Sequence, residues 1–310
     1  MLQGNMRAGR DFIDPNIARK DKFVEGHFAQ HAEGGGPPIF SLIEFNLSGL
    51  CSRKCVFCPR VDPKIFPNVD RHMSLGLYEK VMKDLAKVRF DGTVLYSAFS
   101  EPLLYKGLEK IIRLSKDCCP DARIEIVSNG DLATGQRLSA LFNAGLATFS
   151  VSMYDGPHQV EHFRRLQAEA GLRDDQMPLR VRWLSPEEHF GITLSNRAGA
   201  VAIKDIGIVP LKRPLKRPCY YPFYQILVDY DGSVLLCAHD WARRLIAGNV
   251  NDDSILTIWD NDVLKRVRRK LIKSDRGFPP CSLCDAKGIL IGKKHFDKWG
   301  EYYEKKSTKK

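Results

Sequence analysis

The sequence predicts an α/β protein in which a partial (β/α)6 barrel precedes a small α+β module. Between residues 39 and 208, apolar runs of strand length alternate with amphipathic stretches of helix length. Such alternation is typical of parallel strands joined by crossover helices, and six units are fewer than the eight of a closed barrel. The composition then changes to a basic, proline-rich segment that begins at Pro210. We therefore expect a TIM-like barrel that is open on one side and is followed by a second, smaller unit.

The expected elements follow one another in order along the chain. Strands are expected at residues 39–46, 93–97, 123–128, 148–153, 179–184 and 201–208, and helices at residues 75–88, 106–117, 134–144 and 159–170. Ser74 stands directly before the first of these helices, where its side chain can cap the helix. In the module, Asp231-Gly232 separates strands at residues 224–228 and 233–236, which indicates a hairpin. A helix is expected at residues 255–272, behind Ser254.

The chain is divided into four regions on this basis. Residues 1–36 are polar and end in three glycines, so they are expected to form an extension with a flexible joint. The barrel is expected at residues 37–208 and the module at residues 209–300. Residues 301–310 form a basic tail, whose last six residues are expected to be disordered.

Composition and charge exclude several classes of protein. The chain has 310 residues, of which 44% are apolar, and this rules out global disorder. It contains no apolar run of about 18 residues, so no membrane span is expected. The N-terminus lacks the apolar core of a secretory signal, which favours a cytoplasmic protein. The net charge of +11 suits an acidic partner, but no nucleic-acid-binding motif accompanies it, so nucleic acid is an unfavoured partner.

Nine cysteines include a group of three directly after the first expected strand. Cys51, Cys55 and Cys58 form a C-x3-C-x2-C pattern. Three thiolates on one short loop can hold three irons of a cubane cluster and leave the fourth iron open. A zinc loop with a fourth ligand elsewhere is the alternative. The odd number of cysteines, without a secretory signal, argues against a disulfide framework and points to metal in a reducing compartment.

A second group of cysteines lies in the expected module. Its members are Cys219, Cys237, Cys281 and Cys284, the last two in a C-x2-C pattern. Four thiolates can saturate an iron–sulfur cluster, and they can equally form a structural zinc site. The spacing alone leaves these two possibilities open.

The cysteine pattern with Phe57 before its last member resembles the radical S-adenosylmethionine (SAM) superfamily. The resemblance implies that the open iron binds SAM and that Phe57 lies near the adenine. Ser100-Glu101-Pro102 resembles the family's Gly-Gly-Glu-Pro motif, although Phe99 stands where the family has glycine. The resemblance implies further SAM contacts after the third strand and on the fourth, namely Ser128, Asn129, Ser150 and Ser152.

The module resembles the SPASM/twitch auxiliary-cluster extension of the same superfamily. The resemblance rests on the runs 231–241, 248–250 and 254–259 and on Asn196-Arg-Ala-Gly199. The four module cysteines imply the shorter twitch form with one auxiliary cluster. The expected cofactors are therefore SAM and two 4Fe–4S clusters. Short relatives of this type include an aminocyclitol dehydrogenase and the neomycin epimerase.

The reaction implied is hydrogen abstraction from a substrate C–H bond by a 5′-deoxyadenosyl radical. The oxidoreductase interpretation, dehydrogenation of a secondary alcohol in a sugar or cyclitol, is favoured. An epimerase of this group needs a thiol as hydrogen donor, and Cys118 and Cys119 are expected on the opposite face of the barrel. His239 and Asp240 are the candidate bases, although Asp240 can instead hold the following turn.

Several alternatives stay open at this stage. Sugar epimerisation and modification of a ribosomal peptide are alternatives within the superfamily. A zinc protein that binds nucleic acid is the alternative from another class. The expected partners are a small, carbohydrate-like substrate and an acidic electron donor such as flavodoxin, which would dock on basic surface.

Overall fold

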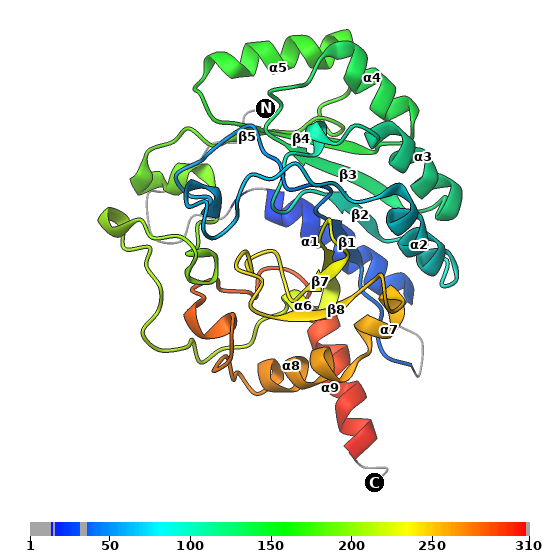
Figure 1. The fold of residues 1–310 in the computed structure, drawn as a ribbon, viewed down its shortest axis with the longest axis vertical. Coiled ribbons are helices and arrows are strands. Elements are labelled where there is room, and N and C mark those ends of the chain that lie inside the picture. The colour runs from blue at the N-terminus through cyan, green and yellow to red at the C-terminus, as the bar shows by residue number, and fades with distance from the viewer. Residues whose placement is uncertain (1–13, 15, 32–35, 308–310) are drawn as a thin grey trace.

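A computed structural model describes residue 14, residues 16–31 and residues 36–307 of the chain. Its strands form one eight-stranded sheet in the order β5-β4-β3-β2-β1-β6-β7-β8 (Figure 1). The strands are β1 (Leu42–Phe45), β2 (Thr93–Tyr96), β3 (Arg123–Ser128), β4 (Thr148–Met153), β5 (Leu179–Val181), β6 (Gln225–Val228), β7 (Ser233–Leu235) and β8 (Ile246–Asn249). In this order, the first six strands, from β5 through β1 to β6, pair in parallel with their neighbours. Strand β7 pairs antiparallel with both β6 and β8. The α/β fold class is confirmed.

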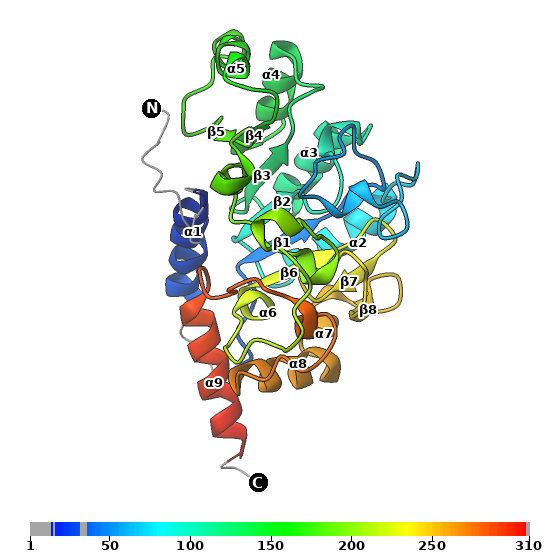
Figure 2. The ribbon, with the colours of Figure 1, turned by 90° about the vertical axis from the view of Figure 1, so that its left-hand side faces the viewer.

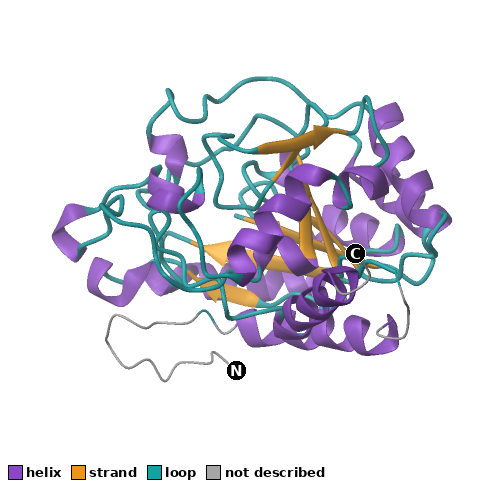
Figure 3. Ribbon diagram, turned by 90° about the horizontal axis from the view of Figure 1, so that it is seen from below, coloured by secondary structure: helices purple, strands orange, loops and turns teal. Residues whose placement is uncertain are grey.

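The crossover helices follow the strand order along the outer side of the sheet (Figure 1). They are α2 (Leu75–Ala86), α3 (Leu108–Cys118), α4 (Gly135–Asn143) and α5 (His158–Glu169). The predicted cap is confirmed, because the Ser74 side chain accepts a hydrogen bond from the Leu77 amide. Thr134 caps α4 in the same way. Seen from below, helices and loops surround the strands (Figure 3).

The sixth parallel strand differs from the prediction. Residues 201–208 form a loop with a single bridge between Ile203 and Ile208, so the strand predicted there is wrong. The sixth strand is β6, which pairs with the other side of β1 and carries the sheet into the predicted module. Residues 201–208 are apolar enough for a strand, but they form only one isolated bridge. Whether an apolar segment becomes a strand depends on a neighbouring strand in the tertiary structure, which the local sequence does not show. The boundary at residue 208 therefore stays a prediction.

The C-terminal segment contains the predicted hairpin and more helices than expected. It includes α6 (Tyr221–Tyr224), α7 (Ile255–Trp259), α8 (Asp262–Ile272) and α9 (Lys293–Ser307). The hairpin of β6 and β7 around Gly232 is confirmed. The single helix predicted over residues 255–272 is wrong, because Asn261 caps a new helix through the Leu264 amide. The predicted disorder is also wrong for residues 305–307, which are helical, whereas residues 308–310 lie outside the described part.

Helix α1 (Asn16–His31) corrects the prediction for the N-terminal extension. The end of α1 meets the start of α9, where Phe28 contacts His295 at a ring distance of 4.6 Å, and Figure 2 shows α9 below α1. Its Arg19 reaches Glu125 on β3. The flexible extension predicted there is therefore wrong for residues 16–31, and residues 1–13, 15 and 32–35 lie outside the described part.

The hydrophobic core lies between the sheet and the helices that cover it. Phe45, Tyr78 and Val94 are fully buried there. The core continues without a break into the C-terminal segment, where Trp259 and Trp299 enclose the guanidinium of Arg268. No helix in the described part of the chain has the length and apolar character needed to cross a membrane.

Candidate active site

A cavity of about 480 Å³ opens at the carboxyl ends of the parallel strands. Side chains that follow β1 to β5 line its first wall. The same cavity is also lined by residues beside Cys237 and Cys284, namely Ala238, His239, Asp285 and Ala286. In barrels of this architecture the carboxyl ends of the strands carry the chemistry. The cavity is thus lined by residues from both cysteine-containing regions that the sequence analysis predicted to be functional.

The three cysteines of the first group share the first wall of the cavity. Cys51, Cys55 and Cys58 all line it, and the Cys58 amide donates to the Cys55 carbonyl at 2.8 Å. Burial, together with the neighbouring thiols of Cys58 and Cys51, raises the pKa of Cys55 to about 12. The loop therefore places all three thiols at the same cavity.

Arg53, which lies within this loop, anchors it to the ends of β3 and β4. Its guanidinium donates to both Asp131 and Asp155, with closest distances of 2.6 Å, and lies 4.9 Å from the ring centre of Tyr154. Sequence reasoning did not single out Arg53. Two features of the sequence could have indicated this contact. An arginine lies inside the cysteine motif, and an acidic residue follows each of the two strands.

The four cysteines of the second group converge from three segments. Cys219 precedes α6, Cys237 follows β7, and Cys281 and Cys284 lie on the loop after α8. Burial raises the pKa of Cys237 strongly, and the three other thiols of the group add to the effect. The fold therefore brings the four thiols, which are far apart in the sequence, close enough to interact electrostatically.

The chemistry of the donor sets tests whether these groups fit iron–sulfur clusters. Both groups consist of cysteine thiolates alone, three on one loop and four from three segments. A cubane cluster binds each thiolate through a different iron, so three thiolates leave one iron open and four saturate the cluster. Both donor sets therefore fit 4Fe–4S clusters.

Six of the seven predicted SAM-binding residues line the cavity, namely Phe57, Ser100, Glu101, Ser128, Asn129 and Ser152. The buried Oγ of Ser100 has no hydrogen-bond partner among the described residues, so it is available to a bound molecule. Glu101 ties the strand ends together, since its carboxylate accepts from the Ser128 hydroxyl at 2.7 Å and from the Asn129 amide at 2.9 Å. The polar wall of the cavity fits SAM.

Ser150 is the exception among these residues. It lies on β4, fully buried, and is not among the described residues that line the cavity. Its Oγ has no hydrogen-bond partner in the described part of the chain. Ser152 lies two residues further along the same strand face and does line the cavity.

The two candidate bases are placed differently. His239 lines the cavity, and its Nδ1 lies 3.1 Å from the Ser195 hydroxyl. Burial, with Arg197 and Arg276 nearby, lowers the pKa of His239 to about 3, so the ring is neutral. Asp240 is not among the described lining residues. Both of its carboxylate oxygens accept backbone amides, from Arg244 and Leu245 at 2.9 Å, which matches the structural alternative.

The structure adds polar cavity residues that sequence reasoning missed. Arg197, in the Asn-Arg-Ala-Gly segment, lines the cavity, and its buried Nε has no partner among the described residues. Lys20 and Asp14 reach the cavity from the N-terminal segment, and Glu44 reaches it from β1. The N-terminal residues were missed because the segment was taken as an extension.

Cys118 and Cys119 lie at the end of α3, before β3 begins. Neither is among the described residues that line the cavity. This position, at the amino-terminal side of the strands, is the one expected from the sequence.

Comparison with known proteins identifies both parts of the chain. Residues 45–167 match the radical SAM superfamily, and residues 219–285 match the SPASM family, an iron–sulfur cluster-binding domain. The S-adenosyl-L-methionine-dependent 2-deoxy-scyllo-inosamine dehydrogenase of Niallia circulans is 29% identical over 239 residues, which are 77% of this chain and 90% of that protein.

Two solved structures have the same fold. The crystal structure of BtrN in complex with AdoMet and 2-DOIA superposes with a TM-score of 0.68 at 26% identity, covering 83% of this chain and 97% of that one. The structure of anSMEcpe with bound AdoMet has a TM-score of 0.53 at 13% identity, covering 87% and 94%, and shows the fold alone. Residues 45–167 thus resemble the radical SAM superfamily and residues 219–285 an iron–sulfur cluster-binding SPASM domain, and the two matches imply SAM and 4Fe–4S clusters as the cofactors.

Proposed function

We propose that the chain dehydrogenates a secondary alcohol of a small, carbohydrate-like substrate, with an aminocyclitol as the first candidate. One observation carries the proposal: a single cavity is lined both by the first cysteine group and by residues next to the second group. An oxidation that begins at one centre and delivers an electron to another needs such a chamber. Similarity to the Niallia circulans dehydrogenase supports the substrate class.

The residues proposed to hold the cofactors follow from the cavity wall. Cys51, Cys55 and Cys58 would hold the first cluster, and the four module cysteines would saturate the second. Ser100 and Glu101 are proposed to face the amino group of SAM, with Phe57 beside the adenine. When bound, these groups supply a 5′-deoxyadenosyl radical that removes a hydrogen atom and a second cluster that can accept an electron.

Arg197 is proposed to position the substrate. It lines the same cavity as the first cysteine group and His239. Its free Nε can donate to a substrate hydroxyl, and a hydrogen bond to a charged group contributes about 1.5–3 kcal/mol. Arg197→Ala should therefore lower kcat/KM about tenfold to a hundredfold while SAM affinity stays unchanged. Arg213→Ala, in the exposed linker, is the matched control.

His239 is proposed to accept the proton of the substrate hydroxyl as the substrate radical forms, because its lowered pKa makes it too weak a base to deprotonate the alcohol beforehand. It is the candidate base that reaches the cavity, and the Ser195 hydroxyl fixes the orientation of its ring. A general base must come within hydrogen-bond reach of the proton it takes. We assign no catalytic role to Asp240, because backbone amides occupy its carboxylate.

The test is an anaerobic assay of the holoenzyme with dithionite, SAM and 2-deoxy-scyllo-inosamine. A product two mass units lighter than the substrate, formed with 5′-deoxyadenosine, would support dehydrogenation. Substrate deuterated at the reacting carbon should transfer deuterium to 5′-deoxyadenosine. Cys281→Ala should block product more strongly than SAM cleavage, because the electron acceptor is disturbed.

Epimerisation would give a different result in the same assay. The product would keep the substrate's mass and take up deuterium from solvent. A Cys118→Ala, Cys119→Ala double variant should leave turnover nearly intact if dehydrogenation is correct. A double variant that cleaves SAM but forms no product would instead identify a hydrogen donor and favour epimerisation.

The proposed electron donor is an acidic protein such as flavodoxin, acting in the cytoplasm, where free thiols stay reduced. A shallow hollow at α8 is lined by four basic residues, Arg266, Arg269, Lys270 and Lys273, and by two acidic ones, Asp262 and Asp275. Electrostatic docking there should weaken as salt rises. Arg266→Glu should slow flavodoxin-dependent turnover and leave dithionite-dependent turnover unchanged. Equal rates of the variant and the wild type with flavodoxin would contradict this docking surface.

A further inference from the structure

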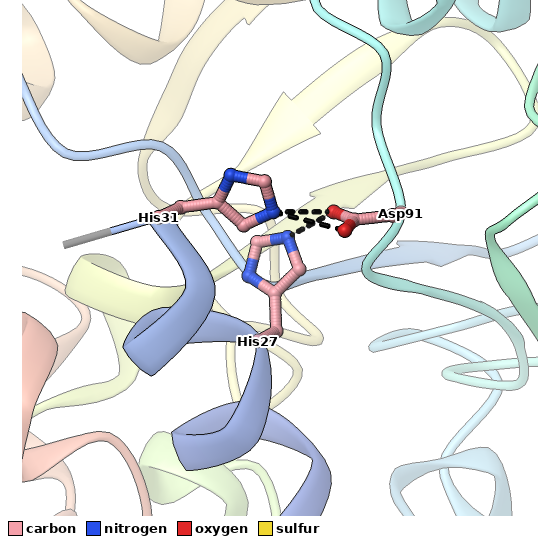
Figure 4. A group of neighbouring side chains, drawn as sticks. All are labelled: His27, His31 and Asp91. Carbon is pink, nitrogen blue, oxygen red and sulfur yellow. Dashed lines mark hydrogen bonds and ion pairs between the residues drawn. The ribbon is translucent and has the colours of Figure 1, made fainter. Parts of the chain in front are cut away.

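A group of two histidines and one aspartate lies outside the candidate active site (Figure 4). His27 and His31 stand one turn apart on α1, and Asp91 lies in the loop just before β2. The Asp91 Oδ1 lies 2.9 Å from Nε2 of His27 and 2.8 Å from Nε2 of His31. Both imidazoles thus point the same nitrogen at one carboxylate.

The ring of His27 is held from its other side. Its Nδ1 lies 2.6 Å from the buried Ser41 hydroxyl, which in turn lies 2.7 Å from Nε2 of His295 on α9. Burial lowers the pKa of His27, although Asp91 opposes this, and the neutral form is the one that binds metal. Partners of this kind fix the orientation of metal-binding histidines.

The group is open to solvent on one side. The His27 side chain is 7% exposed, but those of His31 and Asp91 are 43% and 26% exposed. A metal ion can therefore enter, and water can complete its coordination.

We propose that His27, His31 and Asp91 bind one divalent transition-metal ion, with Zn²⁺ as the best fit. Two imidazole nitrogens and one carboxylate oxygen are donors that zinc accepts, and histidines four residues apart on a helix can share one ion. Bonds of about 2.0–2.1 Å in a tetrahedron place ligand atoms about 3.3 Å apart. The three atoms need only small movements from their hydrogen-bonded positions to reach this spacing.

The position of the site indicates a structural role. Ser41 and Asp91 stand just before β1 and β2, at the amino ends of the strands, and none of the three ligands is among the described residues that line the cavity. The ion would join α1 to the loop before β2. It would therefore fasten α1, which also supplies a cavity residue, Lys20.

The test uses the holoenzyme with both clusters in place and ZnCl₂ as the probe. Dialysed protein should bind one extra zinc per chain in competition with a chelator. His31→Ala and Asp91→Asn should each weaken zinc binding at least about tenfold, by analogy with changes around known sites. His72→Ala is the matched control, because His72 and Asp70 form a similar pair, at 2.8 Å, without a second histidine. Circular dichroism and iron content check that the variants fold.

Two further measurements on the wild-type protein make the outcome decisive. Zinc-edge X-ray absorption should show nitrogen and oxygen neighbours and no sulfur, and zinc should raise the melting temperature of the wild type but not of His31→Ala. Sulfur in the first shell, equal zinc binding by the His31 and Asp91 variants, or no stoichiometric binding would each overturn the proposal. The group would then be a hydrogen-bonded pair of histidines on one carboxylate.

Discussion

Asp14 shows how a single carboxylate can hold one wall of the cavity. Its Oδ2 accepts from Arg182 at 2.5 Å and from Arg180 at 2.7 Å. Burial alone would raise the pKa of Asp14, but the two guanidinium groups outweigh burial and hold it below its usual value. A depressed pKa means that the carboxylate stabilises the fold above its unfolded pKa of about 3.9 and loses this effect as the pH falls below it. At neutral pH the contribution is complete.

Asp14→Asn should therefore destabilise the protein at pH 7. Arg182, which is 5% exposed, would lose its charged partner, and breaking a buried ion pair on one side costs about 3 kcal/mol. The melting temperature of the holoenzyme should fall by about 6 °C or more. Asp70→Asn removes a carboxylate that is 84% exposed and should have little effect. Equal melting temperatures of the Asp14 variant and the wild type would show that the pair contributes nothing.

Arg53 gives a second prediction at this scale. Arg53→Ala removes both ion pairs that anchor the first cysteine loop. Because the Arg53 side chain is 20% exposed, solvent screens these pairs, and SAM affinity should fall only about threefold to tenfold. Lys54→Ala, an exposed neighbour on the same loop, is the control. Calorimetry measures the SAM affinity of the variant and of the wild type. Equal affinities would show that Arg53 does not anchor the loop in the way proposed.

At the scale of elements, local patterns predicted most strands and helices of the barrel. β3 and β4 agree with the predicted residues at both ends, because apolar runs bounded by turn residues identify buried strands. Helix α1 was missed because few of its residues are apolar and buried; it is held by ion pairs and by histidine contacts. β6 was predicted as a strand, but its neighbour β1 lies far away along the chain, and local patterns carry no such information.

The contact between α1 and the sheet can be tested through Arg19. Its two terminal nitrogens donate to the Glu125 carboxylate at 2.6 and 2.8 Å, and Glu125 is 2% exposed. After Arg19→Ala, Glu125 still has an ion pair with Arg123. The free energy of unfolding should therefore fall by about 2 kcal/mol, a value between those typical of surface and of buried ion pairs. Hydrogen exchange should accelerate in residues 16–31. Lys22→Ala, exposed on the same helix, should not change it.

At the scale of the whole molecule, both cysteine groups depend on one continuous sheet. The first group follows β1, and Cys237 follows β7, with only β6 between these strands. The first cysteine set was predicted because its spacing is local, whereas the second set comes from three segments between residues 219 and 284 and only its C-x2-C pair is a local signal. Arg197 and Lys20 were not predicted as cavity residues, because the tertiary fold alone brings them to it.

Cys55→Ala tests whether the two sites assemble independently. The variant should lose SAM cleavage but retain about four irons per chain at the second group, since that group supplies four thiolates of its own. Iron analysis and the absence of 5′-deoxyadenosine measure the two effects. Cys119→Ala, outside the described cavity lining, should retain about eight irons. Loss of all iron from Cys55→Ala would show that the sites depend on each other.

The pairing of β1 with β6 also has a consequence for how the protein is made. The Glu44 carboxylate on β1 accepts from the Gln225 amide on β6 at 2.5 Å, across 181 residues of sequence. While the ribosome is still making the intervening chain, β1 has β2 as a neighbour, and its other edge exposes unpaired backbone groups. Such an edge can pair with another chain. Translation products that stop short of β6 would therefore keep an aggregation-prone strand, which makes completion of the sheet a late event in the biogenesis of this protein.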